Sequence, residues 1–272
     1  MNNLAALMII LFPFFFFYPG KLVKYFGTAS CVIIILASGS RGVFLALGFA
    51  FGIYLIFFKK SFLRISMIAV MIFLFGVLIT QVASDSKQFV RIKEISESHL
   101  AFQELFEEGG IEENSISMRK DLMKTGMDSF YKSYGMGIGA GSTHSVFREK
   151  GGIGVYHLTD LHNFWLELFI ESGVVFTLAF LFWYVGLWAK LYYIGFSKEL
   201  DPKLKYYAHS CSLALIGFSV AAISASSALY FLPMWILFGF SILVLNKSRQ
   251  WLEENSKQEL DYLPDVPDKK EH

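Results

Sequence analysis

The sequence predicts an all-α fold: a polytopic membrane helix bundle with about seven transmembrane helices and one large helical extracytoplasmic loop. Three observations predict it. The 272 residues are 54% hydrophobic and 17% aromatic, and their mean hydropathy is +0.48, outside the range of soluble domains. Apolar runs of helical length recur, and the charges are sorted into particular connecting segments. The net charge is only +1, so no basic field indicates a nucleic-acid partner.

Seven apolar runs predict the membrane spans. A helix needs about 20 apolar residues to cross a bilayer, and shorter ones are accommodated by local thinning. The runs cover residues 4–19, 22–37, 42–58, 62–82, 164–189, 206–229 and 230–245. They divide the chain into four spans within 1–82, a loop at 83–163, three spans within 164–249 and a polar, proline-containing tail at 250–272. We expect this tail to be disordered and cytoplasmic.

Basic residues orient the predicted spans. If crossings alternate, one side receives these clusters: Lys21 and Lys24, then Lys59, Lys60 and Arg64, then Lys190, Lys198, Lys203 and Lys205, then Lys247 and Arg249. The positive-inside rule makes that side cytoplasmic, and the long loop then lies outside. The amino terminus also falls outside, although the first segment lacks the features of a cleaved signal. Either a short tail is translocated unaided or an odd number of helices precedes Met1, and we prefer the second explanation.

The loop is predicted to contain two amphipathic helices and a glycine-rich turn. The helices cover residues 88–108 and 115–134, and Asn114 or Ser115 could cap the second. Four alternating glycines follow at 135–141, Gly137 and Gly139 among them. Such a run prevents regular helix and lets backbone N–H groups approach a partner closely. It is either a hinge or a backbone cradle for a phosphate group, and its spacing does not fit a dinucleotide-binding motif.

His162 is the candidate catalytic base. Residues 171–189 already span about 28 Å as a helix, so His162 through Glu171 should lie at the outer interface. A histidine can take a proton from a hydroxyl near neutral pH, although one at a helix start commonly makes only local hydrogen bonds. Glu167 and Glu171 share a helix face, either as a solvated stripe or as partners that orient a histidine or arginine.

Arg41 and Arg119 are the candidate anion-binding residues. An arginine at a membrane boundary is commonly a snorkelling anchor, but its fork of donors also suits a diphosphate. Arg148, His144 and His157 are further candidates. His157 and His162 are spaced too loosely for a metal site, and the buried, apolar surroundings expected for Cys31 and Cys211 indicate neither a disulfide nor a metal pair. No metal and no cofactor are predicted.

Several short motifs, in their order and spacing, resemble the O-antigen ligase and Wzy-type polymerase superfamily. They are Ser40-Arg41-Gly42, Arg119, the segment at 134–142, Leu161-His162-Asn163 and Glu171-Ser172-Gly173. The resemblance implies metal-independent, inverting transfer of a glycan carried on undecaprenyl diphosphate, on the outer face of the bacterial cytoplasmic membrane. It implies that Arg41 and Arg119 bind the diphosphate and that His162 activates the acceptor hydroxyl, with Asn163, Glu171, Gly137 and Gly139 in supporting positions.

The implied partners are the lipid-linked glycan donor, a glycan or lipid acceptor, membrane lipids, and candidate flippase and chain-length regulator proteins. Members of the superfamily carry additional helices upstream. A polymerase and a ligase differ in the acceptor, and the sequence does not separate them. A transporter or flippase, and an assembly subunit without chemistry, are the alternatives; few ionisable residues within the spans argue against a transporter.

Overall fold

The computed structural model describes residues 2–38, 40–58, 111–149, 161, 163–223 and 231–261, with the backbone alone at 2, 41, 111–121, 148–149 and 258–261. Every regular element in these residues is a helix, which confirms the all-α class. The helices are α1 (Asn2–Phe16), α2 (Lys21–Ala37), α3 (Arg41–Phe58), α6 (Ile111–Lys132), α7 (Ser142–Glu149), α8 (Phe164–Gly195), α9 (Pro202–Ala221) and α10 (Leu232–Asp261).

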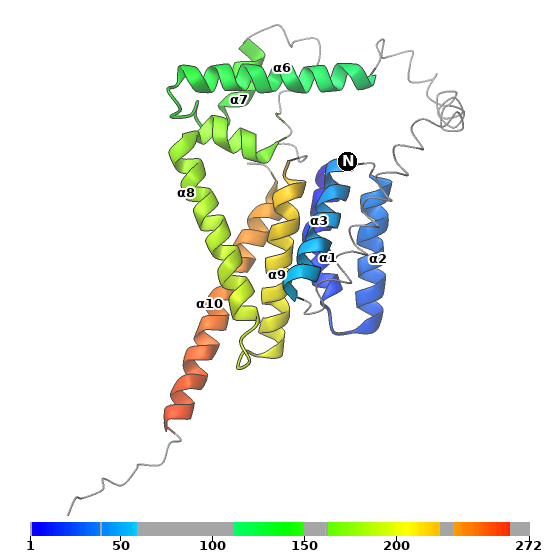
Figure 1. Cartoon of the computed structure of the whole chain (residues 1–272), viewed down its shortest axis with the longest axis vertical. Coiled ribbons are helices and arrows are strands. Elements are labelled where there is room, and N and C mark those ends of the chain that lie inside the picture. The colour runs from blue at the N-terminus through cyan, green and yellow to red at the C-terminus, as the bar shows by residue number, and fades with distance from the viewer. Residues whose placement is uncertain are drawn as a thin grey trace, which may run out of the picture.

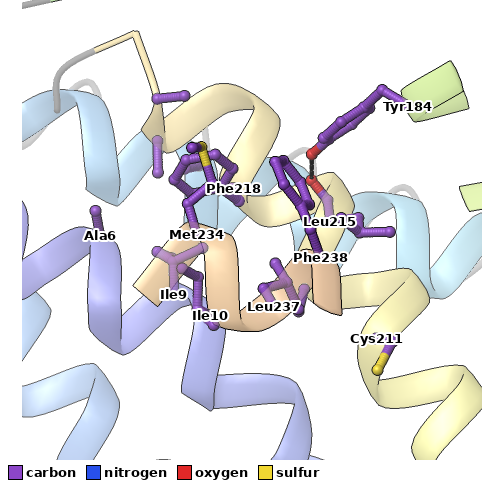
Figure 2. Close-up of a cluster of buried hydrophobic side chains, with 14 of the residues drawn as sticks. Ala6, Ile9, Ile10, Tyr184, Cys211, Leu215, Phe218, Met234, Leu237 and Phe238 are labelled. Atoms are coloured by element: carbon purple, nitrogen blue, oxygen red, sulfur yellow. Dashed lines mark hydrogen bonds between the residues drawn. The ribbon is translucent and has the colours of Figure 1, made fainter. Parts of the chain in front are cut away.

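Helix α9 is the centre of the bundle, with α1, α3, α8 and α10 packed around it (Figure 1). Its buried face is rich in small residues, which let neighbouring backbones approach closely; Gly217, for example, lies against Ile9 of α1. Larger side chains fill the space between α1, α9 and α10, where the Tyr184 hydroxyl of α8 donates to the Leu215 carbonyl (Figure 2). The core residues labelled there are Ala6, Ile9, Ile10, Cys211, Phe218, Met234, Leu237 and Phe238.

Hydrogen bonds between helices define two ends of the bundle. At the basal end, the Tyr206 hydroxyl of α9 donates to the Phe14 carbonyl of α1 (2.6 Å), and the Tyr192 hydroxyl of α8 donates to the Phe57 carbonyl of α3 (3.1 Å). At the apical end, the Phe164 amide that starts α8 donates to the Ala222 carbonyl after α9 (2.9 Å). Because α3 ends at the basal end, its first residue lies at the apical end.

A layer of helices covers the apical end (Figure 1). It consists of α6, α7 and the first turns of α8, and a small apolar cluster holds it together. The buried members of that cluster are Leu122 and Phe130 of α6, Phe147 of α7, Leu161, and Ile170 of α8. The Phe130 and Phe169 rings are only 4.4 Å apart between centroids. The layer therefore has its own core beside that of the bundle.

Helix α8 joins the layer to the bundle through a sharp kink. Gly173 has φ 80° and ψ 174°, values that are not helical, so α8 consists of a short segment before it and a long one after it. The short segment lies in the layer and the long segment descends along the bundle (Figure 1). The segment 171–189, predicted to be long enough to cross a membrane by itself, lies almost entirely after this break, and the interfacial position of the residues before it stays a prediction.

The predicted spans and the observed helices agree closely at some boundaries and differ at others. Helices α1, α2, α3, α8, α9 and α10 each overlap a predicted run, whereas the run at 62–82 lies outside the described residues. Among the described helices, α8 alone is long and apolar enough to cross a membrane by length and composition, and the apolar parts of α1 and α3 are shorter. The count of seven spans is therefore not confirmed.

Two predicted boundaries are wrong. Helix α10 continues to Asp261, so residues 250–261 are not the start of a disordered tail. Helix α6 begins at Ile111, so Asn114 and Ser115 lie inside it and neither is its cap. The first predicted loop helix, at 88–108, lies outside the described residues. Cys31 and Cys211 are free and buried, as predicted.

Large apolar side chains cover much of the outside of the bundle. On α8, Val175 is 79% exposed and Phe182 is 85% exposed, and on α2 Leu22 is 84% exposed. A water-soluble protein rarely exposes contiguous apolar surface of this kind. The surface is the kind that a bilayer covers.

Candidate functional site

The glycine-rich turn completes the hydrogen bonding of the α8 kink. The break at Gly173 removes backbone partners that a continuous helix would supply. The turn replaces them: Ile138 N–H donates to the Ile170 carbonyl (3.0 Å), Gly139 N–H donates to the Glu171 carbonyl (3.0 Å), and the freed Val174 N–H donates to the Gly135 carbonyl (3.1 Å). The turn and the kink are thus two halves of one backbone structure.

Only glycine fits where the two backbones meet. Gly137 has φ 87°, and a Cβ added there would lie 2.6 Å from the Gly173 amide nitrogen. A Cβ on Gly173 would lie 2.5 Å from the carbonyl atoms of Met136. Gly135, Gly139 and Gly141 also have positive φ values, which side chains disfavour. The prediction that this run excludes regular helix is confirmed.

The carboxylate of Glu171 fills the mouth of the turn. One oxygen, Oε2, accepts from the Gly141 amide (2.9 Å). The other, Oε1, accepts from the Thr143 hydroxyl (2.6 Å) and the Thr143 amide (3.3 Å). Thr143 lies in the first turn of α7, so the carboxylate sits where the helix dipole favours a negative charge.

These contacts decide between the interpretations of the turn and of the two glutamates. The amides of Ile138, Gly139 and Gly141 donate to the protein itself, so these donors are not a free cradle for a phosphate group. Glu167 and Glu171 are 3% and 4% exposed, so the interpretation of them as a solvated stripe is wrong. A carboxylate of the chain, rather than an external anion, occupies the turn.

The start of α8 is anchored to the end of α9. Asn163 is the N-cap, and its side chain accepts from the Leu166 amide (3.2 Å). The indole N–H of Trp165 donates to the Ser219 carbonyl (2.8 Å), near the Phe164–Ala222 backbone bond. Donors and acceptors that helix ends leave unpaired therefore satisfy one another across the two helices.

His162, the candidate base, lies outside the described residues, but both of its neighbours in the chain are described. Leu161 is buried in the apolar cluster of the layer. Asn163 caps α8. The chain is therefore held by packing before His162 and by hydrogen bonding after it.

The two candidate arginines are described by their backbone only. Arg41 is the first residue of α3, at the apical end, and the preceding Ser40 is buried. Arg119 belongs to α6, which crosses the same end in Figure 1. The backbone thus brings the elements that carry Arg41, Arg119 and Asn163 to one end of the molecule. Arg148 is the penultimate residue of α7, and its backbone alone is described. His157 lies outside the described residues.

Three residues of the site were not among the predicted site residues. Thr143 binds the Glu171 carboxylate, Trp165 ties α8 to α9, and Gly173 forms the kink. Gly173 had a signal in the sequence, because a glycine between a polar segment and a long apolar run commonly marks a break. Thr143 had none, since its partner is 28 residues away.

Comparison with known proteins identifies two sequence matches. A family model described as O-antigen ligase matches residues 26–181, a range that contains Arg41, Arg119, the glycine turn, His162 and the kink. The chain is also similar to the teichuronic acid biosynthesis protein TuaE of Bacillus subtilis, with 28% identity over 138 residues. That alignment covers 50% of this chain and 28% of the relative, so this chain aligns with less than a third of the relative's length.

Proposed function

Because the chain belongs to the O-antigen ligase family, we propose that it is a membrane glycosyltransferase of cell-surface polysaccharide biosynthesis. It polymerises or ligates glycan units carried on undecaprenyl diphosphate, at the outer face of the bacterial cytoplasmic membrane. The observation that carries the proposal is the extent of the family match, since one continuous region contains every candidate site residue. The polymer is of the cell-surface class to which the teichuronic acid of the relative belongs.

In the proposed reaction, His162 takes the proton of an acceptor hydroxyl. The acceptor oxygen attacks the anomeric carbon of the donor glycan from the face opposite the diphosphate, and the configuration inverts. The bond from that carbon to the diphosphate oxygen breaks, and undecaprenyl diphosphate leaves with the electron pair. Arg41 and Arg119 stabilise the charge that develops on the leaving group, which is the task that fixed cations perform best in a site of low dielectric. The proposed reaction needs no metal ion.

The arrangement of the helices supports this assignment. The apical end holds the start of α3, the α6 helix and the start of α8, so residues from distant parts of the chain can act on one substrate. The apolar sides of α2 and α8 would face lipid, where the donor's isoprenoid chain lies. We propose seven spans, with the layer outside and the carboxyl end inside. Flippase and chain-length regulator proteins are the proposed partners.

Replacement of His162 and Arg41 tests the proposal. His162→Ala and Arg41→Ala should each reduce polymer formation in cells at least about hundredfold, as expected for loss of an acid–base or charge-stabilising group. His272→Ala and Arg249→Ala are matched controls, since neither belongs to the proposed site, and both should leave polymer formation unchanged. Membrane insertion is checked by fractionation. Normal polymer in both site variants would contradict the proposal.

The lipid-linked glycans of a deletion strain distinguish the two acceptors. Single repeat units on the lipid indicate a polymerase, whereas intact but unattached chains indicate a ligase. Flux of the lipid-linked glycan across vesicles that is insensitive to His162→Ala would instead indicate a transporter.

A further inference from the structure

Glu171 is an anionic side chain that lies almost entirely inside the apical layer. It is 4% exposed, and its two oxygens accept from Gly141 and twice from Thr143. A buried carboxylate is costly unless donors satisfy it. An apolar side chain at this position of α8 could not accept these three hydrogen bonds, so the carboxylate has a task other than filling space.

We infer that Glu171 is a positioning residue for the proposed glycosyl transfer, because its carboxylate clamps the glycine turn and the start of α7 onto the short segment of α8 that begins next to His162. The inference rests on the proposed function. Glu171 itself is not proposed to touch the substrate.

The short segment of α8 is pinned at both of its ends. At its beginning, Phe164 and Trp165 are hydrogen-bonded to Ala222 and Ser219 of the α9 end. At its far end, about 10 Å along the helix axis at 1.5 Å per residue, Glu171 is hydrogen-bonded to Gly141 and to Thr143 of α7. Without the carboxylate, the segment keeps its backbone hydrogen bonds to the glycine turn and its apolar contacts in the layer, but Gly141 and the start of α7 lose their hydrogen bonds to it and can shift relative to it.

The chemistry of the clamp requires a carboxylate and a hydroxyl. Three N–H and O–H donors converge on the two carboxylate oxygens of Glu171. A glutamine has an NH2 group in place of one oxygen, so a donor would face a donor there. Thr143→Val keeps the shape of the side chain but removes the hydroxyl donor, whereas Thr143→Ser keeps the donor. The pair of substitutions therefore separates the hydrogen bond from the packing.

The test uses the full chain, purified in nanodiscs, and the lipid-linked glycan extracted from the deletion strain as the donor. Glu171→Gln should lower kcat at least about tenfold while the donor KM stays within about twofold, since misplacement of a reacting group affects the chemical step. Thr143→Val should act in the same direction, and Thr143→Ser should restore kcat. The matched control is Asp128→Asn, which changes an exposed carboxylate of the same layer and should have no effect.

Amide hydrogen exchange at residues 135–143 provides a readout that does not depend on activity. Glu171→Gln should speed the exchange of the Gly141 or the Thr143 amide at least about tenfold, because an NH2 group replaces one of the two acceptor oxygens. If exchange accelerates while kcat stays at the wild-type value and His162→Ala is inactive, the positioning role is overturned and the proposed function stands. If Thr143→Ser fails to restore kcat, the hydrogen bond is not the cause and the inference is likewise overturned. If His162→Ala keeps full turnover, the proposed function itself fails.

Discussion

At positions 137 and 173, two separate physical reasons exclude any residue other than glycine. Each glycine has a positive φ, which costs a residue with a side chain about 1–2 kcal/mol. Each also faces the backbone of the other's segment at a distance that excludes a Cβ. Because the obstacle is backbone on both sides, no side-chain rearrangement can relieve it.

Substitution of Gly173 by alanine should therefore destabilise the protein by more than about 2 kcal/mol, the sum of the backbone strain and the displaced turn. The measurement is thermal unfolding in detergent. Gly186 is the matched control, because it lies in the same helix with nothing within 4 Å of an added Cβ. Gly186→Ala should leave the unfolding temperature unchanged or raise it slightly. Equal effects of the two substitutions would contradict the close approach at the kink.

Asn163 offers a second test at a single residue. Asn163→Ala removes the acceptor for the Leu166 amide and should cost about 1 kcal/mol. Asn163→Asp keeps an acceptor at the cap and should retain the stability of the wild type. Faster amide exchange at Leu166 in the alanine variant alone is the expected result. Acceleration of the same size in both variants would show that capping is not the role of this side chain.

For single residues, the sequence predicted the local backbone conformation better than it predicted contacts between distant residues. The glycines at 135–141 predicted an irregular turn because only glycine tolerates the backbone angles involved. Their partner, the segment around Glu171, lies some thirty residues further along the chain, and no local pattern indicates a contact across such a separation. The buried state of Glu171 was missed for the same reason.

Helix α8 connects the two parts of the fold, the apical layer and the helix bundle. Its short segment belongs to the apical layer and its long segment to the bundle. The Thr177 hydroxyl, beyond the kink, donates to the Leu168 carbonyl before it (3.4 Å). Bonds from the glycine turn, from α7 and from α9 hold the short segment at a fixed angle, so the angle is set by tertiary contacts and not by α8 alone.

Trp165→Phe tests the link between α8 and α9. The substitution keeps an aromatic ring in the core but removes the donor to the Ser219 carbonyl, with an expected loss of about 1 kcal/mol. Trp183 of the same helix is 39% exposed, and Trp183→Phe serves as the control with little expected change. Thermal unfolding of the two variants in the same detergent provides the comparison. A larger loss for Trp183→Phe would contradict the importance of this bond.

The elements were predictable where an apolar run ends at a polar boundary. The limits of α2 and α3 follow the runs at 22–37 and 42–58 within one residue. The kink in α8 was not predicted as a change of direction, because hydropathy records how apolar a residue is and not the direction of the chain. Helix α10 exceeds its apolar run for a related reason: its polar extension is anchored by Trp251, whose indole N–H donates to the Glu199 carbonyl (3.1 Å).

The molecule as a whole has two chemically different ends. The apical end has the layer, the glycine turn and the elements that carry the candidate site residues. The basal end has the start of α2 with Lys21 and Lys24, the α8–α9 connection with Lys198, and the part of α10 that contains Lys247. The sequence predicted this separation from the order of the apolar runs and the sorting of the basic residues between them, and the described helices alternate in direction in the same way. Which end faces the cytoplasm stays a prediction.

Cysteine labelling in intact cells tests that orientation directly. Cys31 and Cys211 are both buried, so replacing them with alanine gives a background for single cysteines at exposed positions. Ser145 of α7 represents the apical end and Lys198 the basal end. The positive-inside rule predicts that a membrane-impermeant maleimide labels Ser145→Cys in intact cells and Lys198→Cys only after permeabilisation. The reverse pattern would put the apical layer in the cytoplasm, where a lipid-linked glycan on the outer face could not reach it, and the proposed reaction would then be excluded together with the orientation.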